Sequence, residues 1–281
     1  MSDPQTADLL AVEHLGVDYP VRGRGKEPVR ALRDVSLTVR PGECLGLVGE
    51  SGSGKTTLGR AILGLVRPSS GRIVYDGQDI TSLPKNSRRA LSSEIQVVFQ
   101  DPYSSLNPAL PVAAILAEPL EVAGASRAEA RERIRQVLDD VGLPPDTAGR
   151  LPRAFSGGQR QRIAIARALV RRPRLVVCDE PVSALDLSTQ ARVLDLLVDV
   201  QRRTGVAYLF ISHDLDVIRH VSHRAAVLRH GEIVESGPAD DVTRRPHHAY
   251  TKRLMLSSPV ADPDRQARRR AGRRPPRKAA G

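Results

Sequence analysis

The strongest constraint on the fold is an apolar segment that runs directly into a glycine-rich loop and then into a helix. Residues 44–48 (CLGLV) have the character of a buried strand, and Gly49–Thr56 fits the pattern G-x-x-x-x-G-K-[ST]. Glycines in such a loop let the backbone curl so that successive N–H groups point at one anion, towards which the following helix turns its positive dipole end. The sequence therefore predicts a nucleotide phosphate site. A simple glycine-rich turn is disfavoured, because pattern and context agree.

A second apolar strand segment ends in two carboxylates. Residues 175–178 (LVVC) are followed by Asp179 and Glu180, and chemistry at a γ-phosphate needs acidic groups in such a place. We expect Asp179 to hold Mg²⁺ through its water shell, and Glu180 to act as general base on the attacking water. An acidic pair by itself is more often a helix N-cap or a solvated loop. A phosphate loop in the same chain favours the catalytic interpretation.

A second anion-binding loop is predicted where residues 155–162 (FSGGQRQR) lead into another helix. The serine and two glycines, Ser156 to Gly158, would present free backbone N–H groups at the helix N-terminus. Taken alone, such a loop is more often a plain helix cap, so both interpretations stay open at this point.

The hydrophobic pattern indicates an α/β chain. Short strands with turns occupy residues 9–80, including a hairpin at Asp76-Gly77. Strand signals vanish over 101–165, where a capping box formed by Ser126 and Glu129 begins a helix. Buried strands then alternate with amphipathic helices, which predicts a parallel sheet covered on both faces. A small β segment around Gly231 and a short helix at 247–256 follow.

We therefore expect five segments along the chain. They are residues 1–100 as the first part of a nucleotide-binding core with a β subdomain, 101–165 as a helical subdomain, 166–235 as the second part of the core, 236–261 as a C-terminal extension, and 262–281 as a basic disordered tail rich in Arg, Pro, Gly and Ala.

Amino-acid composition argues against several classes of protein. Trp is absent and aromatic residues make up 3% of the 281 residues, so stacking platforms for single-stranded nucleic acid are not expected. The tail at 262–281 carries +6 of the formal charge of +11, which leaves a mildly basic body. Cys44 and Cys178 lie in apolar runs without a CxxC motif, which favours buried, reduced thiols in a cytosolic protein. Neither a signal peptide nor a membrane span is expected, so the chain should be soluble.

These motifs together resemble the ATP-binding subunits of ABC transporters. Residues 155–159 (FSGGQ) are similar to the family signature LSGGQ, with Phe155 in place of leucine. The resemblance covers about residues 10–260, and the motifs occur in the family's order. It implies a RecA-like P-loop NTPase core with an antiparallel β subdomain and a helical insertion. It also implies ATP hydrolysis with ATP and Mg²⁺ bound.

The resemblance assigns roles to individual residues. Lys55 would reach the β- and γ-phosphates, Tyr19 would stack on adenine, and His213 would contact the γ-phosphate. Taken alone, Tyr19 is equally an ordinary strand residue and His213 a structural histidine. Thr56, Gln100 and Asp179 would hold the metal, with Gln100 also touching the water. The full expected site is Tyr19, Gly49, Ser51, Gly52, Ser53, Gly54, Lys55, Thr56, Thr57, Gln100, Ser156, Gly157, Gly158, Gln159, Asp179, Glu180, Asp186 and His213. The histidines at 220, 223, 230, 247 and 248 lack the spacing of metal ligands and are expected at the surface.

Two further segments narrow the resemblance. Residues 100–108 (QDPYSSLNP) and the C-terminal residues 235–251 look like the oligopeptide, dipeptide and nickel importer ATPases, and within them like the second ATPase of the pair. No cysteine follows Cys178, so no iron–sulfur cluster is predicted. The implied function is an ATP-hydrolysing subunit of a binding-protein-dependent importer. The solute stays open between oligopeptide, dipeptide, nickel complex and glutathione.

This interpretation implies particular partners. They are a second ABC ATPase subunit, two transmembrane permease subunits and an extracytoplasmic solute-binding protein, with the chain at the cytoplasmic face of the membrane and no specific nucleic acid. The resemblance also implies a composite site, in which Ser156 serves the ATP of the partner subunit and Asp186 lies in the loop that crosses the interface. One alternative is a non-transport ABC ATPase acting on nucleic acid, which the basic tail would suit. Another is a small-molecule P-loop kinase, which would not need Ser156 to Gly158 or His213.

Overall fold

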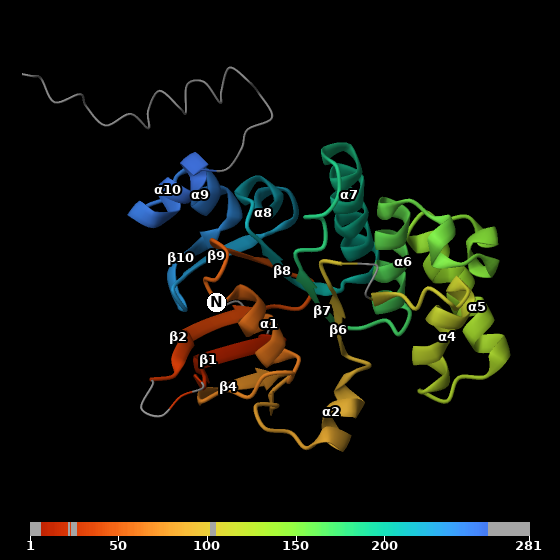
Figure 1. The fold of residues 1–281 in the computed structure, drawn as a ribbon, viewed down its shortest axis with the longest axis horizontal. Helices are drawn as coiled ribbons and strands as arrows, with labels where there is room; N and C mark the ends of the chain where they lie inside the picture. Colours follow the sequence, from red (N-terminus) through yellow and green to blue (C-terminus); the bar gives the residue numbers. More distant parts are fainter. Residues whose placement is uncertain (1–6, 22, 24–26, 102–104, 258–281) are drawn as a thin grey trace, which may run out of the picture.

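The computed structural model describes residues 7–21, 23, 27–101 and 105–257, which form two β-sheets with helices around them (Figure 1). One sheet has four strands in the order β2-β1-β4-β5, and the other has six in the order β10-β9-β3-β8-β7-β6. This arrangement confirms the predicted α/β fold class. The tail at 262–281, predicted to be disordered, and residues 102–104 of the QDPYSSLNP segment lie outside the described residues.

The six-stranded sheet contains the apolar segments that were predicted to be buried strands. Its strands are β3 (Cys44–Val48), β6 (Ile95–Val98), β7 (Leu175–Asp179), β8 (Ala207–Ser212), β9 (Arg224–Arg229) and β10 (Glu232–Pro238). Neighbouring strands from β9 to β6 pair in parallel, and β10 alone pairs antiparallel, with β9. The β segment around Gly231 thus extends this sheet. Because β3, β7 and β8 run in one direction, their carboxyl ends meet at a single edge.

The four-stranded sheet is antiparallel and contains β1 (Leu10–Tyr19), β2 (Val29–Val39), β4 (Ser70–Tyr75) and β5 (Gln78–Asp79). The hairpin predicted at Asp76-Gly77 joins β4 to β5, with Tyr75 opposite Gln78. Helix α1 (Lys55–Ile62) contacts both β2 and the six-stranded sheet. Its Leu58 and Ile62 are fully buried in the core shared by the two sheets.

Apart from α2, the remaining helices fall into two groups at opposite ends of the six-stranded sheet (Figure 1). The first contains α4 (Val112–Glu121), α5 (Arg127–Asp140) and α6 (Gly157–Leu169), beside α7 (Leu187–Thr204), with short turns at Pro145–Gly149 and Pro152–Ala154. The capping box of Ser126 and Glu129 is present at the start of α5, as predicted. The second group contains α8 (Leu215–Val221), α9 (Ala239–Arg244) and α10 (Ala249–Ser257), and α2 (Lys85–Leu91) lies below α1 in Figure 1.

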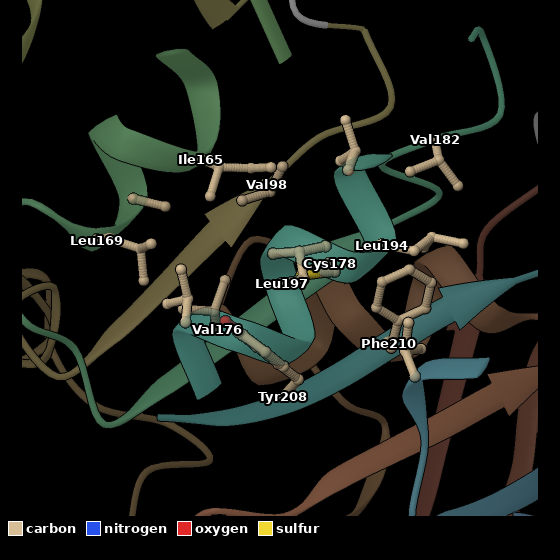
Figure 2. Packing of buried hydrophobic residues seen from close by; sticks show 14 of the residues in the cluster. Val98, Ile165, Leu169, Val176, Cys178, Val182, Leu194, Leu197, Tyr208 and Phe210 are labelled. Carbon is tan, nitrogen blue, oxygen red and sulfur yellow. The ribbon is translucent and has the colours of Figure 1, made fainter. Parts of the chain in front are cut away.

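The second core packs α6 and α7 onto the other face of the six-stranded sheet (Figure 2). This core contains Ile165 of α6 and Leu197 of α7 together with Val176 and Cys178 of β7 and Tyr208 of β8. Both cysteines are buried and free, as expected, and burial raises the pKa of Cys44 to about 12, so this thiol stays protonated at neutral pH. Within the described part of the chain, none of the helices has both the length and the apolar character needed to cross a membrane.

Candidate functional site

The predicted phosphate loop connects β3 to α1 and has the curled backbone that the glycines allow. Gly54 has φ of +112°, and a Cβ there would lie 2.6 Å from the carbonyl oxygen of Ala31, so only glycine fits. The Lys55 ammonium donates to the carbonyl oxygens of Gly49 at 2.7 Å and Glu50 at 3.0 Å. Burial lowers the pKa of Lys55, while the Glu180 and Asp179 carboxylates act in the opposite sense. The Lys55 ammonium is thus hydrogen-bonded to carbonyl oxygens of its own loop.

Asp179 lies beside the loop because β7 ends at the same edge of the sheet as β3. The Thr56 hydroxyl donates to Asp179 Oδ1 at 3.1 Å. Burial raises the pKa of Asp179, and the hydrogen bond from Thr56 opposes that shift. A hydroxyl and a carboxylate oxygen therefore converge at the start of α1. Hard oxygen donors of this kind fit Mg²⁺.

Glu180 and His213 follow neighbouring strands, and their side chains meet. Glu180 Oε2 lies 3.2 Å from His213 Nδ1, and the Glu180 amide donates to the carbonyl oxygen of Ile211 at 3.0 Å. Glu180 has φ of +50°, a left-handed conformation that is uncommon for a residue with a side chain and that concentrates at functional sites. Its side chain is 20% exposed, so it can reach solvent water.

A cleft of about 390 Å³ joins the loop to Glu180. Six loop residues expected at the site line it together with Glu180, namely Ser51, Gly52, Gly54, Lys55, Thr56 and Thr57. The other lining residues are Val29, Arg30, Ala31, Arg33 and His230. His230 is exposed, as expected, and it also borders this cleft. It reaches the cleft because the turn between β9 and β10 packs against β2, where the Arg33 amide donates to the carbonyl oxygen of Gly231 at 2.8 Å.

Other predicted residues do not line this cleft, Tyr19 and Gln100 among them. Tyr19 ends β1, is 37% exposed, and pairs in the sheet with Val29, which does line the cleft. Gln100 is exposed two residues beyond β6, which ends at Val98, earlier than the strand pattern indicated. Among the described residues, Gln100 makes no hydrogen bond to the Thr56 and Asp179 pair.

The predicted second loop does not line the cleft. Ser156 begins α6 with a complete capping box, in which its hydroxyl accepts from the Gln159 amide and its own amide donates to Gln159 Oε1 at 3.0 Å. Gly158 lies against α7, where a Cβ would lie 2.3 Å from Thr189 Cγ2. Asp186 begins α7 and accepts from the Thr189 amide at 3.0 Å, and hydrogen bonds led by that from Ser188 lower its pKa to about 2. Both loops therefore act as helix caps within this chain.

A separate groove of about 310 Å³ lies between β6, α4 and α6. Its rim exposes apolar side chains, with Phe99 39% and Val122 64% exposed. Glu118, Arg167 and Arg171 add charged groups to its wall, and Arg167 lies 4.0 Å from the Glu118 carboxylate. A groove with exposed apolar side chains and a charged wall suits a protein partner.

Comparisons with known proteins agree with this geometry. The chain matches the family model described as ABC transporter over residues 32–183, and the model described as oligopeptide/dipeptide transporter, C-terminal region, over residues 234–281. The glutathione import ATP-binding protein GsiA of Pectobacterium atrosepticum is 49% identical over 265 residues, and the match covers 92% of this chain. It covers only 42% of GsiA, so this chain spans less than half the length of that relative. The probable peptide ABC transporter ATP-binding protein y4tS of Sinorhizobium fredii is 49% identical over 262 residues, with 92% of this chain and 74% of the relative covered.

Solved structures show the same fold. The protein cbiO1 of Clostridium perfringens, part of the ABC transporter complex cbiONQ, superposes with a TM-score of 0.76 at 27% identity, covering 85% of this chain and 91% of that one. The ATP-binding cassette MJ0796, in a dimeric post-hydrolysis state bound to ADP and Pi, superposes with a TM-score of 0.73 at 29% identity. That match covers 82% of this chain and 98% of MJ0796.

Proposed function

Because the chain belongs to the ABC transporter family of ATP-binding proteins, we propose that it hydrolyses ATP to power the import of peptides or related small solutes. The match of residues 234–281 to the C-terminal region of oligopeptide/dipeptide transporters supports this solute class. The two relatives described above are named for glutathione import and for probable peptide transport. These findings favour an importer over an ATPase that acts on nucleic acid.

The observation that carries the proposal is the convergence of the phosphate loop and Glu180 on one cleft, with His213 in contact with the Glu180 carboxylate. In this proposal the Lys55 ammonium and the loop amides bind the β- and γ-phosphates. Glu180 accepts a proton from the water that attacks the γ-phosphorus, which releases ADP and inorganic phosphate. His213 orients the Glu180 carboxylate and contacts the γ-phosphate.

Thr56, Asp179 and Gln100 are the residues that would hold Mg²⁺ in this scheme. The hydroxyl and carboxylate oxygens of Thr56 and Asp179 lie within 3.1 Å of each other, and oxygen donors are what Mg²⁺ prefers. Bound Mg²⁺ would offset the negative charge of the phosphates. Tyr19, which pairs with the cleft residue Val29, would stack on the adenine ring.

We propose further that the complete site needs two ATPase subunits. The loop at Ser156–Gln159 lies outside this chain's cleft, which supports a role for it at the ATP of a partner subunit. MJ0796, with the same fold, is described as dimeric with ADP and Pi bound. Asp186, at the start of α7, would lie at the interface. The partner would be a related ATPase, and binding and hydrolysis of ATP would close and reopen the pair.

The remaining partners follow from the transporter class. Two transmembrane permease subunits would hold the chain at the cytoplasmic face of the membrane, and an extracytoplasmic binding protein would deliver the solute. The groove between β6, α4 and α6 is our proposed contact for a permease, since it combines exposed Phe99 and Val122 with the charged side chains of Glu118, Arg167 and Arg171.

Reconstitution tests this proposal. The tagged chain, extracted from its native membranes with the subunits that accompany it, should support ATP-dependent uptake of glutathione or short peptides into proteoliposomes once the binding protein is added. The Lys55→Ala chain should assemble equally and import nothing. Purification with nucleic acid and without any membrane subunit would instead favour the nucleic-acid ATPase, and ATP-dependent phosphorylation of a small acceptor would favour a kinase.

A further inference from the structure

The C-terminal part of the chain contacts the phosphate loop from the side away from β7. Leu228 of β9 passes so close to Gly49 that a Cβ there would lie 2.2 Å from the Leu228 carbonyl oxygen. The Gly231 amide, at the turn between β9 and β10, donates to the carbonyl oxygen of Ser53 at 2.9 Å. Backbone groups of β9 and its turn therefore fix both ends of the loop.

A side chain from α10 supplies a third contact. The Glu50 amide donates to the Tyr250 hydroxyl at 3.0 Å, although the two residues are 200 positions apart. Tyr250 is 3% exposed, while Glu50 is exposed, so the hydrogen bond is partly buried. The guanidinium of Arg229 lies 5.0 Å from the centre of the tyrosine ring and holds it by a cation–π contact.

Tyr250 is placed by the start of α10. The Glu235 carboxylate of β10 accepts from the amides of His247 at 2.7 Å and His248 at 3.2 Å, just before the helix begins. Negative charge at a helix N-terminus also interacts favourably with the helix dipole. Leu254, one helical turn further on, is buried and anchors α10 in the core. Glu235 and Leu254 thus hold α10 in place, and Arg229 holds the tyrosine ring.

Glu50, which Tyr250 contacts, also contacts the Lys55 ammonium. Tyr250 holds the amide of Glu50, while the carbonyl oxygen of Glu50 accepts from the Lys55 ammonium at 3.0 Å. Both backbone groups of Glu50 are therefore committed, one to α10 and one to Lys55. A shift of this residue would move the lysine that is expected to meet the β- and γ-phosphates.

We propose that Tyr250 is a positioning residue for the nucleotide, through which the docked C-terminal helix α10 sets the affinity of the phosphate loop for ATP. This inference rests on the proposed function of the loop. Tyr250 contacts no nucleotide; it keeps Glu50 and Lys55 in the binding geometry before the phosphates arrive, which lowers the ordering cost of binding. The transporter-specific C-terminal region, matched from residue 234 onwards, thereby acts on the ATP site.

The test is Tyr250→Phe in the full chain, which keeps the ring and removes the hydroxyl. We expect Kd for MgADP and KM for MgATP to rise about 3- to 10-fold, the effect of one lost hydrogen bond, while kcat stays within about twofold. Glu235→Gln should also raise Kd for MgADP. In the Tyr250→Phe background, Glu235→Gln should cause no further rise in Kd, because both substitutions act through one contact.

The matched control is Tyr208→Phe. The Tyr208 hydroxyl is buried and has no hydrogen-bond partner among the described residues, so its loss tests truncation of a buried tyrosine alone. Tyr208→Phe should leave Kd unchanged. Equal Kd values for Tyr250→Phe and wild type, or equal rises in both tyrosine variants, would overturn the inference while ATP hydrolysis by the wild type still supports the proposed function. A wild-type chain that binds no ATP would overturn both.

Discussion

At the scale of single residues, the candidate site depends on two side chains that leave neighbouring strands at the same level. Asp179 of β7 pairs in register with Ile211 of β8, so the residues that follow, Glu180 and His213, emerge side by side. The left-handed backbone of Glu180 turns its carboxylate toward His213. A base needs such a partner, because a carboxylate that is free to rotate is rarely aimed at the attacking water.

The first residue-scale prediction concerns His213→Ala. Removal of the imidazole should lower kcat for ATP hydrolysis about 10- to 100-fold, because Glu180 loses the group that orients it. ATP affinity should stay within about threefold. Steady-state hydrolysis and nucleotide titration measure the two effects.

His220→Ala is the matched control for that substitution. His220 pairs with Asp195 at 2.7 Å in a similar histidine–carboxylate contact, but on α8 and α7 rather than at the cleft. It should hydrolyse ATP like the wild type. If His213→Ala and His220→Ala reduce hydrolysis equally, the Glu180–His213 pair has no special role.

At the scale of elements, two helices in this chain begin with the same device. Ser126 caps α5 and Ser156 caps α6, each with a complete capping box. Ser156 thus acts as a helix cap in this chain, and its role at the ATP of a partner subunit stays a prediction. The two caps differ in sequence, because Ser156 precedes two glycines and Ser126 does not. We expect only the cap at Ser156 to have a second role, in ATP hydrolysis.

Substitution of each serine by alanine tests whether only Ser156 has a role in ATP hydrolysis. Both Ser126→Ala and Ser156→Ala should lower the free energy of unfolding by about 1 kcal/mol, the usual effect of a lost N-cap. Only Ser156→Ala should also lower ATP hydrolysis by the assembled transporter, by roughly tenfold. Chemical denaturation and ATPase assays report the two quantities. Equal hydrolysis by both variants would leave the loop at Ser156 as a cap and nothing more.

Periodicity and motifs predicted most elements, since each depends on local sequence. The strand before the phosphate loop, the capping box at Ser126 and the strand before Asp179 all follow from contiguous residues. Contacts between distant segments carry no such signal. Sequence patterns do not show that the turn at His230 reaches β2, or that Tyr250 meets Glu50 across 200 residues. These placements come from the order of strands in the six-stranded sheet.

At the scale of the whole molecule, two composite ATP sites would need two phosphate loops and two loops like that at Ser156, and one chain provides one of each. Its cleft contains the phosphate loop and Glu180, while its loop at Ser156 lies elsewhere. A pair of such subunits, each placing its second loop over the other's cleft, would enclose the nucleotide and exclude water, as the proposed cycle of closing and reopening requires.

The central claim is that ATP is bound at this cleft and hydrolysed with Glu180 as base. The direct measurement is the identity of the nucleotide that remains bound after incubation with MgATP, together with the rate of phosphate release. The wild type should retain ADP, Glu180→Gln should retain uncleaved ATP with hydrolysis reduced at least 100-fold, and Lys55→Ala should retain neither. Glu121→Gln, at the exposed end of α4, should behave as the wild type. Hydrolysis by Glu180→Gln at the wild-type rate would contradict the account.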